Sequence, residues 1–227
     1  MPAGVPDWLQ PLLSAVSGNA PALLFPYIPP AGGGHRESAV LVLFGEGPGG
    51  PDLLLIERAA SLRSHAGQPA FPGGMIDPQD DGPVAAALRE AWEETGLEPA
   101  GVEPLAELPP VWLAPSGVSV VPVIAWWRRP SAVAPRDAAE VSAVERVPLG
   151  ELADPANRLR VRHPSGFVGP AFAVRSLLVW GFTAGIVDRL LELGGWARPW
   201  DHDRVRELPE DVVSLARRER WERGVQA

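Results

Sequence analysis

The sequence predicts an α/β fold in which a mixed sheet lies between helices. Short apolar runs bounded by glycine and proline indicate strands, and segments with apolar residues three and four positions apart indicate helices. The two kinds of element do not alternate strictly, so a purely parallel βαβ sheet is not expected. With 227 residues, 46% of them hydrophobic, the chain is long enough for one large domain with a sizeable core.

The first third of the chain is expected to hold one helix and two strands. Residues 5–17 have tryptophan and leucine on one helical face, and residues 26–37 form a connector rich in proline and glycine. Apolar strands are predicted over residues 39–44 and 52–58. The glycine-rich loop GEGPGG between them is typical of a hairpin.

The middle of the chain is expected to hold a second helix and three strands. The helix is predicted over residues 84–95, and Gly96 provides a natural C-terminal stop. Strands are predicted over residues 105–114, 117–127 and 142–149, where apolar residues cluster between turn signals.

The C-terminal third is expected to be helical. A helix is predicted over residues 176–195, where it ends at a glycine pair, and a final helix over residues 209–223. This pattern suggests a main domain at residues 38–195, an N-terminal extension at 1–37 packed on it, and a C-terminal helical extension at 196–227. The two extensions are candidates for lids, capping helices or contacts in a homodimer.

Composition and charge exclude several partners. The net charge is −8 and lysine is absent, which argues against a broad nucleic-acid surface. The absence of cysteine excludes disulfides and thiolate metal sites and fits a cytoplasmic protein. No apolar run reaches the length of about 18 residues that indicates a membrane span, and the N-terminus lacks the basic segment of a secretory signal. We therefore expect no nucleic-acid or membrane partner, but a small anion held together with a metal ion.

The stretch REAWEETGL, residues 89–97, concentrates the chemistry. Glu90, Glu93 and Glu94 share one helix face, where their like charges repel. A hard divalent cation would turn that repulsion into coordination, because Mg²⁺ and Mn²⁺ prefer carboxylate oxygen. Arg89 stands four residues before Glu93 and can orient it. The alternative is a solvated charged face without a ligand.

This stretch resembles the signature box of the Nudix hydrolase family, which begins here at Gly74. The first half departs from the general box: 14 residues separate Gly74 from Arg89 instead of 13, and aspartate stands where glutamate is expected. Either Asp80 or Asp81 could make the structural contact with Arg89. The resemblance implies the Nudix α/β/α sandwich with a mixed central sheet. The second half of the box is matched by these residues: Arg89, Glu90, Ala91, Glu93, Glu94, Gly96 and Leu97.

The resemblance also implies roles for these residues. Glu90, Glu93 and Glu94 would ligate Mg²⁺ or Mn²⁺ with the Gly74 carbonyl nearby, and a glutamate would take a proton from the attacking water. Glu140 is a further candidate for that base, or for a residue that supports the metal ligands without binding the metal itself. The alternative for Glu140 is a surface glutamate at the start of a strand.

Upstream of the box, LLIERAASLRSHAGQPAFPGG (residues 54–74) resembles the coenzyme A pyrophosphatase branch of the family. The longer, aspartate-bearing box resembles that branch too, and the resemblance extends over about residues 38–195. Arginine suits the phosphates of coenzyme A, although these arginines could instead pair with acidic residues of the chain, and the histidine could be structural. The resemblance implies substrate contacts by these residues: Arg58, Arg63, His65, Gln68 and Phe71.

The activity implied is cleavage of coenzyme A, and of acyl or oxidised forms, to 3′,5′-ADP and 4′-phosphopantetheine. A second reading keeps the box and changes the substrate to ADP-ribose, NADH or another nucleoside diphosphate derivative. It gains support if the upstream arginines are occupied by internal salt bridges. A third reading, a nucleotide-binding domain without turnover, is disfavoured by the intact glutamates.

Overall fold

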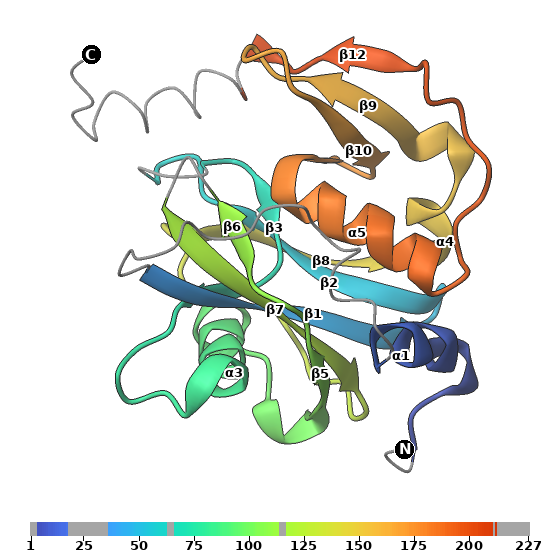
Figure 1. Cartoon of the computed structure of the whole chain (residues 1–227). Coiled ribbons are helices and arrows are strands. Elements are labelled where there is room, and N and C mark those ends of the chain that lie inside the picture. Colours follow the sequence, from blue (N-terminus) through green and yellow to red (C-terminus); the bar gives the residue numbers. More distant parts are fainter. Residues whose placement is uncertain (1–3, 18–35, 63–65, 114–116, 211, 213–227) are drawn as a thin grey trace.

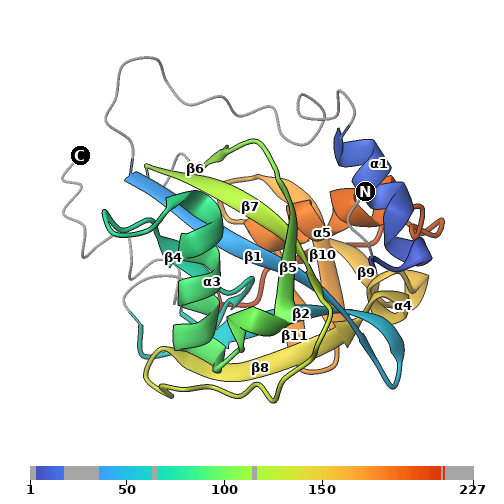
Figure 2. The same ribbon diagram turned by 90° about the horizontal axis from the view of Figure 1, so that it is seen from below.

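A mixed eight-stranded sheet crosses the middle of the molecule, with helix α3 on one face and helices α1 and α5 on the other (Figures 1 and 2). The computed structural model describes residues 4–17, 36–62, 66–113, 117–210 and 212. The predicted α/β fold with a mixed sheet between helices is therefore confirmed. No helix within these ranges is long and apolar enough to cross a membrane.

The main sheet has the central order β3-β2-β1-β7-β5, with β4 beside β1, β6 beside β7 and β8 beside β2. Strands β1 and β7 run parallel and the other pairs are antiparallel, which makes the sheet mixed. The strands are β1 (Arg36–Gly47), β2 (Gly50–Arg58), β3 (Pro69–Ala70), β4 (Gly73–Met75), β5 (Val102–Glu107), β6 (Val111–Leu113), β7 (Val118–Trp127) and β8 (Val141–Pro148).

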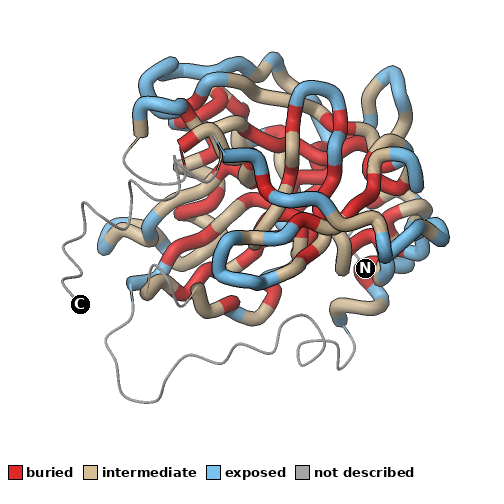
Figure 3. The backbone as a smooth tube through the Cα atoms, turned by 90° about the horizontal axis from the view of Figure 1, so that it is seen from above, coloured by how far each residue is buried: buried red, intermediate tan, exposed pale blue. Residues whose placement is uncertain are grey.

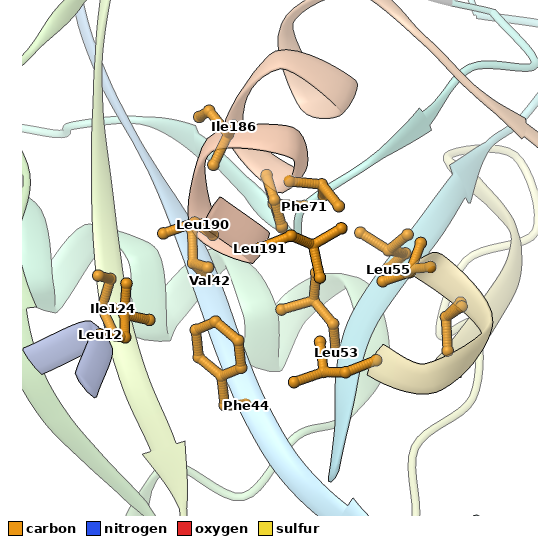
Figure 4. Packing of buried hydrophobic residues seen from close by; sticks show 14 of the residues in the cluster. Leu12, Val42, Phe44, Leu53, Leu55, Phe71, Ile124, Ile186, Leu190 and Leu191 are labelled. Carbon is orange, nitrogen blue, oxygen red and sulfur yellow. The ribbon is translucent and has the colours of Figure 1, made fainter. Parts of the chain in front are cut away.

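Alternation along β1 divides the core between the two faces of the sheet, as expected for side chains that point to opposite sides in turn. Ala39, Leu41 and Leu43 pack toward α3 (Gly82–Thr95), whereas Val42 and Phe44 pack toward α5 (Gly181–Leu193). Figure 4 shows the second group against Leu190 and Leu191 of α5. In Figure 3 the buried backbone lies in the middle of the molecule and the exposed segments at its rim.

The N-terminal helix contributes to the same core. A 3-10 helix η1 (Asp7–Leu9) leads into α1 (Gln10–Ser17), and Leu9, Leu12 and Leu13 are buried. The helix predicted over residues 5–17 is present from Asp7 onward, and its leucine face packs on the face of the sheet that carries α5. The connector at 26–37 lies almost entirely outside the described residues.

A second sheet, absent from the sequence prediction, covers the far side of α5 (Figure 1). Its order is β11-β10-β9-β12, and Phe172 and Val174 of β10 pack on α5. The strands are β9 (Arg158–Arg162), β10 (Val168–Val174), β11 (Leu177–Val179) and β12 (Val205–Glu207), and a short helix α4 (Leu149–Leu152) precedes them with the 3-10 helix η3 (Pro155–Asn157).

Two predicted elements need correction. The helix predicted over 176–195 begins only at Gly181, because residues 177–179 pair with β10 as strand β11. The strand predicted over 105–114 is two strands, since residues 108–110 include two prolines without N–H donors. In the C-terminal segment, β12 is a strand that the sequence reading missed, and the predicted helix over 209–223 lies almost entirely outside the described residues.

Candidate active site

Helix α3 holds the acidic residues on a rigid support. Its inward side carries small residues, Ala86, Ala87 and Ala91, which are fully buried and allow the helix to lie close to the sheet. The helix ends at Gly96, whose φ of 71° is left-handed and whose N–H donates to Trp92 O at 2.9 Å. A helix over residues 84–95 that stops at Gly96 is therefore confirmed.

Arg89 donates hydrogen bonds to three acidic side chains, those of Asp80, Glu90 and Glu93. Its Nε and Nη2 donate to the two oxygens of Asp80 at 3.0 and 2.9 Å, and Nη2 also donates to Met75 O at 3.0 Å. Its Nη1 donates to Glu90 at 3.0 Å and to Glu93 at 3.2 Å. These bonds hold the pKa of Asp80 below its ordinary value. Of the two aspartates left open by the sequence, Asp80 makes the contact with Arg89.

Glu94 is a buried carboxylate beside a backbone donor. Its side chain is 7% exposed, its Oε2 accepts a hydrogen bond from Gly73 N at 3.0 Å, and its Oε1 lies 3.7 Å from Arg58 Nη1. Burial raises the pKa of Glu94 to about 7, and the charges of Glu90 and Glu140 act in the same direction. The Gly73 N–H was not assigned a role from the sequence, although the glycine pair itself was the available signal.

Glu90 lies against Gly74. A Cβ atom added to Gly74 would fall 2.3 Å from the Glu90 Cδ, so the carboxylate occupies space that only glycine leaves free. A Cβ on Gly73, where φ is 158°, would fall 2.3 Å from the carbonyl oxygen of Ala39. Burial also raises the pKa of Glu90. The glycine pair thus brings the part-buried carboxylate of Glu90, the buried carboxylate of Glu94 and the backbone of β4 together.

Glu93 is placed differently from the other two glutamates. Its side chain is 46% exposed and pairs with Arg89, on the outer side of the helix. In the part of the chain that the structure describes, no three His, Asp or Glu side chains already form a group that could hold a metal. Glu90 and Glu94 nevertheless fit a divalent cation, because burial disfavours their charged forms and a hard cation would restore them.

The segment of residues 66–74, here called the recognition segment, contains β3 and most of β4 and contacts Glu94 through Gly73. Of the predicted substrate contacts, Arg63 and His65 lie outside the described residues, and Gln68 is half-buried. Phe71 is 3% exposed and lies in the core with Ile186 and Leu191 of α5 (Figure 4), so the structure assigns it to packing rather than to a substrate contact.

Arg58 ends strand β2 next to the acidic helix. Its distance of 3.7 Å to Glu94 makes an ion pair but is too long for a hydrogen bond. Its Nε is buried and has no hydrogen-bond partner among the residues that the structure describes. Arg58 therefore keeps donor capacity for an anionic ligand, although one of its nitrogens already faces a carboxylate.

A bulge between β2 and β8 brings the Glu140 loop to the same edge. The register shifts between Glu57 and Arg58, and the extra residue Ser142 donates its hydroxyl to Glu57 O at 3.1 Å. Ala59 N donates to Glu140 O at 2.9 Å, and the side chain of Glu140 is exposed. Bulges of this kind often re-aim residues near active sites. Glu140 is thus held near Glu94 through its backbone.

Comparisons with known proteins show the family of this chain. A family model described as the NUDIX domain matches residues 34–165. A protein of Escherichia coli K12, described as an uncharacterized Nudix hydrolase NudL, is 40% identical over 174 residues, covering 70% of this chain and 84% of that protein.

Solved structures with a similar fold include two further proteins. A Nudix hydrolase of M. smegmatis, RenU, has a TM-score of 0.47 and 22% identity, covering 74% of this chain and 91% of that chain. The NUDIX domain of Shewanella oneidensis NrtR, solved with ADP ribose, has a TM-score of 0.43 and 27% identity, covering 59% of this chain and 85% of that chain.

Proposed function

Since this chain belongs to the Nudix hydrolase family, we propose that it is a metal-dependent enzyme that cleaves the pyrophosphate of coenzyme A. The products would be 3′,5′-ADP and 4′-phosphopantetheine, and acyl and oxidised forms of coenzyme A are further candidate substrates. A chain without cysteine suits the reducing cytoplasm, which is the compartment we propose for it.

One observation carries the proposal: the recognition segment is bonded directly to the acidic helix. Gly73, near the end of the segment, donates to Glu94 at 3.0 Å, and Arg58, at the end of β2, lies 3.7 Å from the other oxygen of Glu94. Arg58, which suits a phosphate, therefore lies directly beside Glu94, which suits a metal ion. A diphosphate needs both, because its charge must be held and its phosphorus must be attacked.

Glu90, Glu94 and the Gly74 carbonyl would hold the metal, and Glu93 would join them by releasing Arg89. A bound Mg²⁺ or Mn²⁺ would lower the pKa of water and neutralise charge that develops on the phosphoryl oxygens. Glu94 and the exposed Glu140 are the candidates for accepting a proton from the attacking water. Arg89 and Asp80 would keep Glu90 in place through their hydrogen bonds.

The choice of coenzyme A depends on arginine that is free to meet its additional 3′-phosphate. The exposure of the Arg58 side chain, 26%, supports this choice, together with a contact to Glu94 that is too long for a hydrogen bond. Arginine binds phosphate through its planar fork of N–H donors, and the terminal nitrogens of Arg58 would make this contact.

A second candidate substrate class is ADP-ribose, NADH or another nucleoside diphosphate derivative without the 3′-phosphate. The ion pair between Arg58 and Glu94 favours it, because an arginine occupied internally is less available to an extra phosphate. In this case the same carboxylates would act on a diphosphate that carries less negative charge.

Product analysis tests the proposal. The purified protein is incubated with coenzyme A and Mg²⁺ or Mn²⁺, with EDTA as the control, and the products are identified by mass spectrometry. We expect 3′,5′-ADP and 4′-phosphopantetheine only when metal is present. Hydrolysis of ADP-ribose or NADH without cleavage of coenzyme A would support the second candidate, and tight binding without any turnover would indicate a non-catalytic domain.

A further inference from the structure

Thr183 connects helix α5 to the recognition segment. Its side chain is 5% exposed, and its hydroxyl donates to the carbonyl oxygen of Pro69 at 3.2 Å, across a separation of 114 residues. Thr183 stands in the first turn of α5, beyond residues 34–165 that match the family model. The bond therefore joins an element outside the matched region to the recognition segment, whose Gly73 N–H donates to Glu94.

The recognition segment has two halves that are held by different contacts. In the first half, Gly67 N donates to Arg58 O at 2.9 Å, and Arg58 N donates to Gln68 O at 3.1 Å. Pro69 follows directly and pairs with Glu57 of β2. The Thr183 bond therefore acts on the half of the segment that is hydrogen-bonded to the backbone of Arg58.

The second half has anchors of its own. The Phe71 ring is buried in the core, the carbonyl of Pro72 accepts from Leu41 N at 2.8 Å, and Gly73 N donates to Glu94. These contacts fix the half of the segment that lies next to Glu94, and they do not involve Thr183. A disturbance at Pro69 is thus expected to reach Arg58 and Gln68 before it reaches Glu94.

We propose that Thr183 is a positioning residue for substrate binding, which acts by fixing Pro69 and through it the placement of Arg58 and Gln68. A buried carbonyl that loses its donor is costly, so the Pro69 peptide would turn toward another partner and carry its neighbours with it. A displacement of about 1 Å at a substrate-contacting group is enough to weaken binding strongly. The effect on binding rests on the function proposed above, whereas the effect on the segment does not.

Four variants separate positioning from simple support of the fold. Thr183→Val keeps the shape and removes the hydroxyl, Thr183→Ser keeps the hydroxyl, and Thr183→Ala is a second hydroxyl-free variant should the valine fail to fold. The control is Val187→Ala, which removes buried apolar volume from the same helix without touching Pro69.

Amide hydrogen exchange in the full-length protein gives a readout that needs no substrate. We expect Thr183→Val to lower the protection of the Gly67 and Arg58 amides by about tenfold and to leave the Gly73 amide protected. Thr183→Ser should restore protection, and Val187→Ala should not lower it selectively at these two amides. Equal loss at Gly67, Arg58 and Gly73, or no loss at any of them, would overturn the proposal.

The kinetic readout uses whichever diphosphate the wild-type protein cleaves. We expect Thr183→Val to raise KM by about tenfold while kcat changes less than about twofold, with rescue by Thr183→Ser. A fall in kcat at constant KM would contradict a role in substrate binding. If the wild-type protein cleaves no diphosphate, the proposed function fails, and the exchange experiment alone decides whether Thr183 positions the segment.

Discussion

The backbone N–H of Gly73 donates to Glu94 Oε2 at 3.0 Å, and this bond joins two parts of the sequence that carry different chemistry. Gly73 ends the stretch that resembles a substrate-binding signature, and Glu94 belongs to the acidic helix. Because the bond is part-buried and charge-assisted, it fixes the distance between the two parts.

The substitution Glu94→Gln should abolish metal-dependent hydrolysis while the protein stays folded. Loss of one charged metal ligand costs several kcal/mol, so we expect kcat to fall by roughly a thousandfold. The amide oxygen of glutamine can still accept from Gly73, which should preserve the fold. Steady-state kinetics and circular dichroism check both parts, with the exposed Glu98→Gln as the matched control. Full activity of Glu94→Gln would remove the proposed metal site.

The free energy of unfolding of the metal-free protein should fall as pH rises from 4.5, the ordinary pKa of glutamate, to about 7, the raised pKa of Glu94. Burial raises the pKa of Glu94 from 4.5 to about 7, so in this window the folded protein keeps a proton that the unfolded chain releases. Below the window both states are protonated and the penalty is absent; above it the full penalty, about 3 kcal/mol, applies.

Urea unfolding in EDTA measures this effect. We expect Glu94→Gln to match the wild-type protein at about pH 5 and to be more stable at about pH 8. If Glu94→Gln is no more stable than the wild-type protein at the higher pH, this result would contradict a buried Glu94 carboxyl with a raised pKa.

The substitution Gly74→Ala should inactivate the protein with little loss of stability. The new Cβ would meet the end of the Glu90 side chain, which can swing away, so the fold should persist while the carboxylate is displaced. We expect kcat to fall about a hundredfold, as for other small misplacements of reacting groups. Gly150→Ala is the control, because nothing lies near its Cβ position. Unchanged kinetics for Gly74→Ala would show that the Glu90 position is not important.

The two neighbouring aspartates should behave differently. Asp80→Asn weakens the bidentate contact with Arg89, which also orients Glu90 and Glu93, so activity should fall roughly 10- to 100-fold. Asp81→Asn should leave kcat/KM near the wild-type value, since Asp81 makes no side-chain hydrogen bond at the helix start. Metal titrations of both variants are the measurement, and a larger defect in Asp81→Asn would reverse the assignment.

Side-chain spacing and turn residues in the sequence predicted the helices and strands whose bounds depend on neighbouring residues. The helix from Val84 and its end at Gly96 follow from side-chain spacing and a left-handed glycine, and the hairpin of β1 and β2 follows from its glycine-rich turn. The second sheet was missed because its strands are short and are interrupted by proline, glycine and arginine. Its apolar face becomes visible only when α5 packs against it.

The candidate site was predictable as a set of residue types but not as an arrangement. Helical spacing alone placed Glu90, Glu93 and Glu94 together, whereas in the structure Glu94 is buried beside Gly73 and Glu93 is exposed beside Arg89, which also bonds Glu90. The contact between Thr183 and Pro69 spans 114 residues and depends on how α5 packs, which no local pattern reports.

The substrate comparison between coenzyme A and dephospho-coenzyme A tests the central claim most directly. The two differ only in the 3′-phosphate, so the ratio of their kcat/KM values with Mg²⁺ or Mn²⁺ measures what that phosphate contributes to transition-state binding. A charge-assisted contact with arginine contributes about 1.5–3 kcal/mol, so coenzyme A should be preferred by at least about tenfold. Equal cleavage of the two compounds, or a preference for ADP-ribose or NADH over both, would contradict the claim.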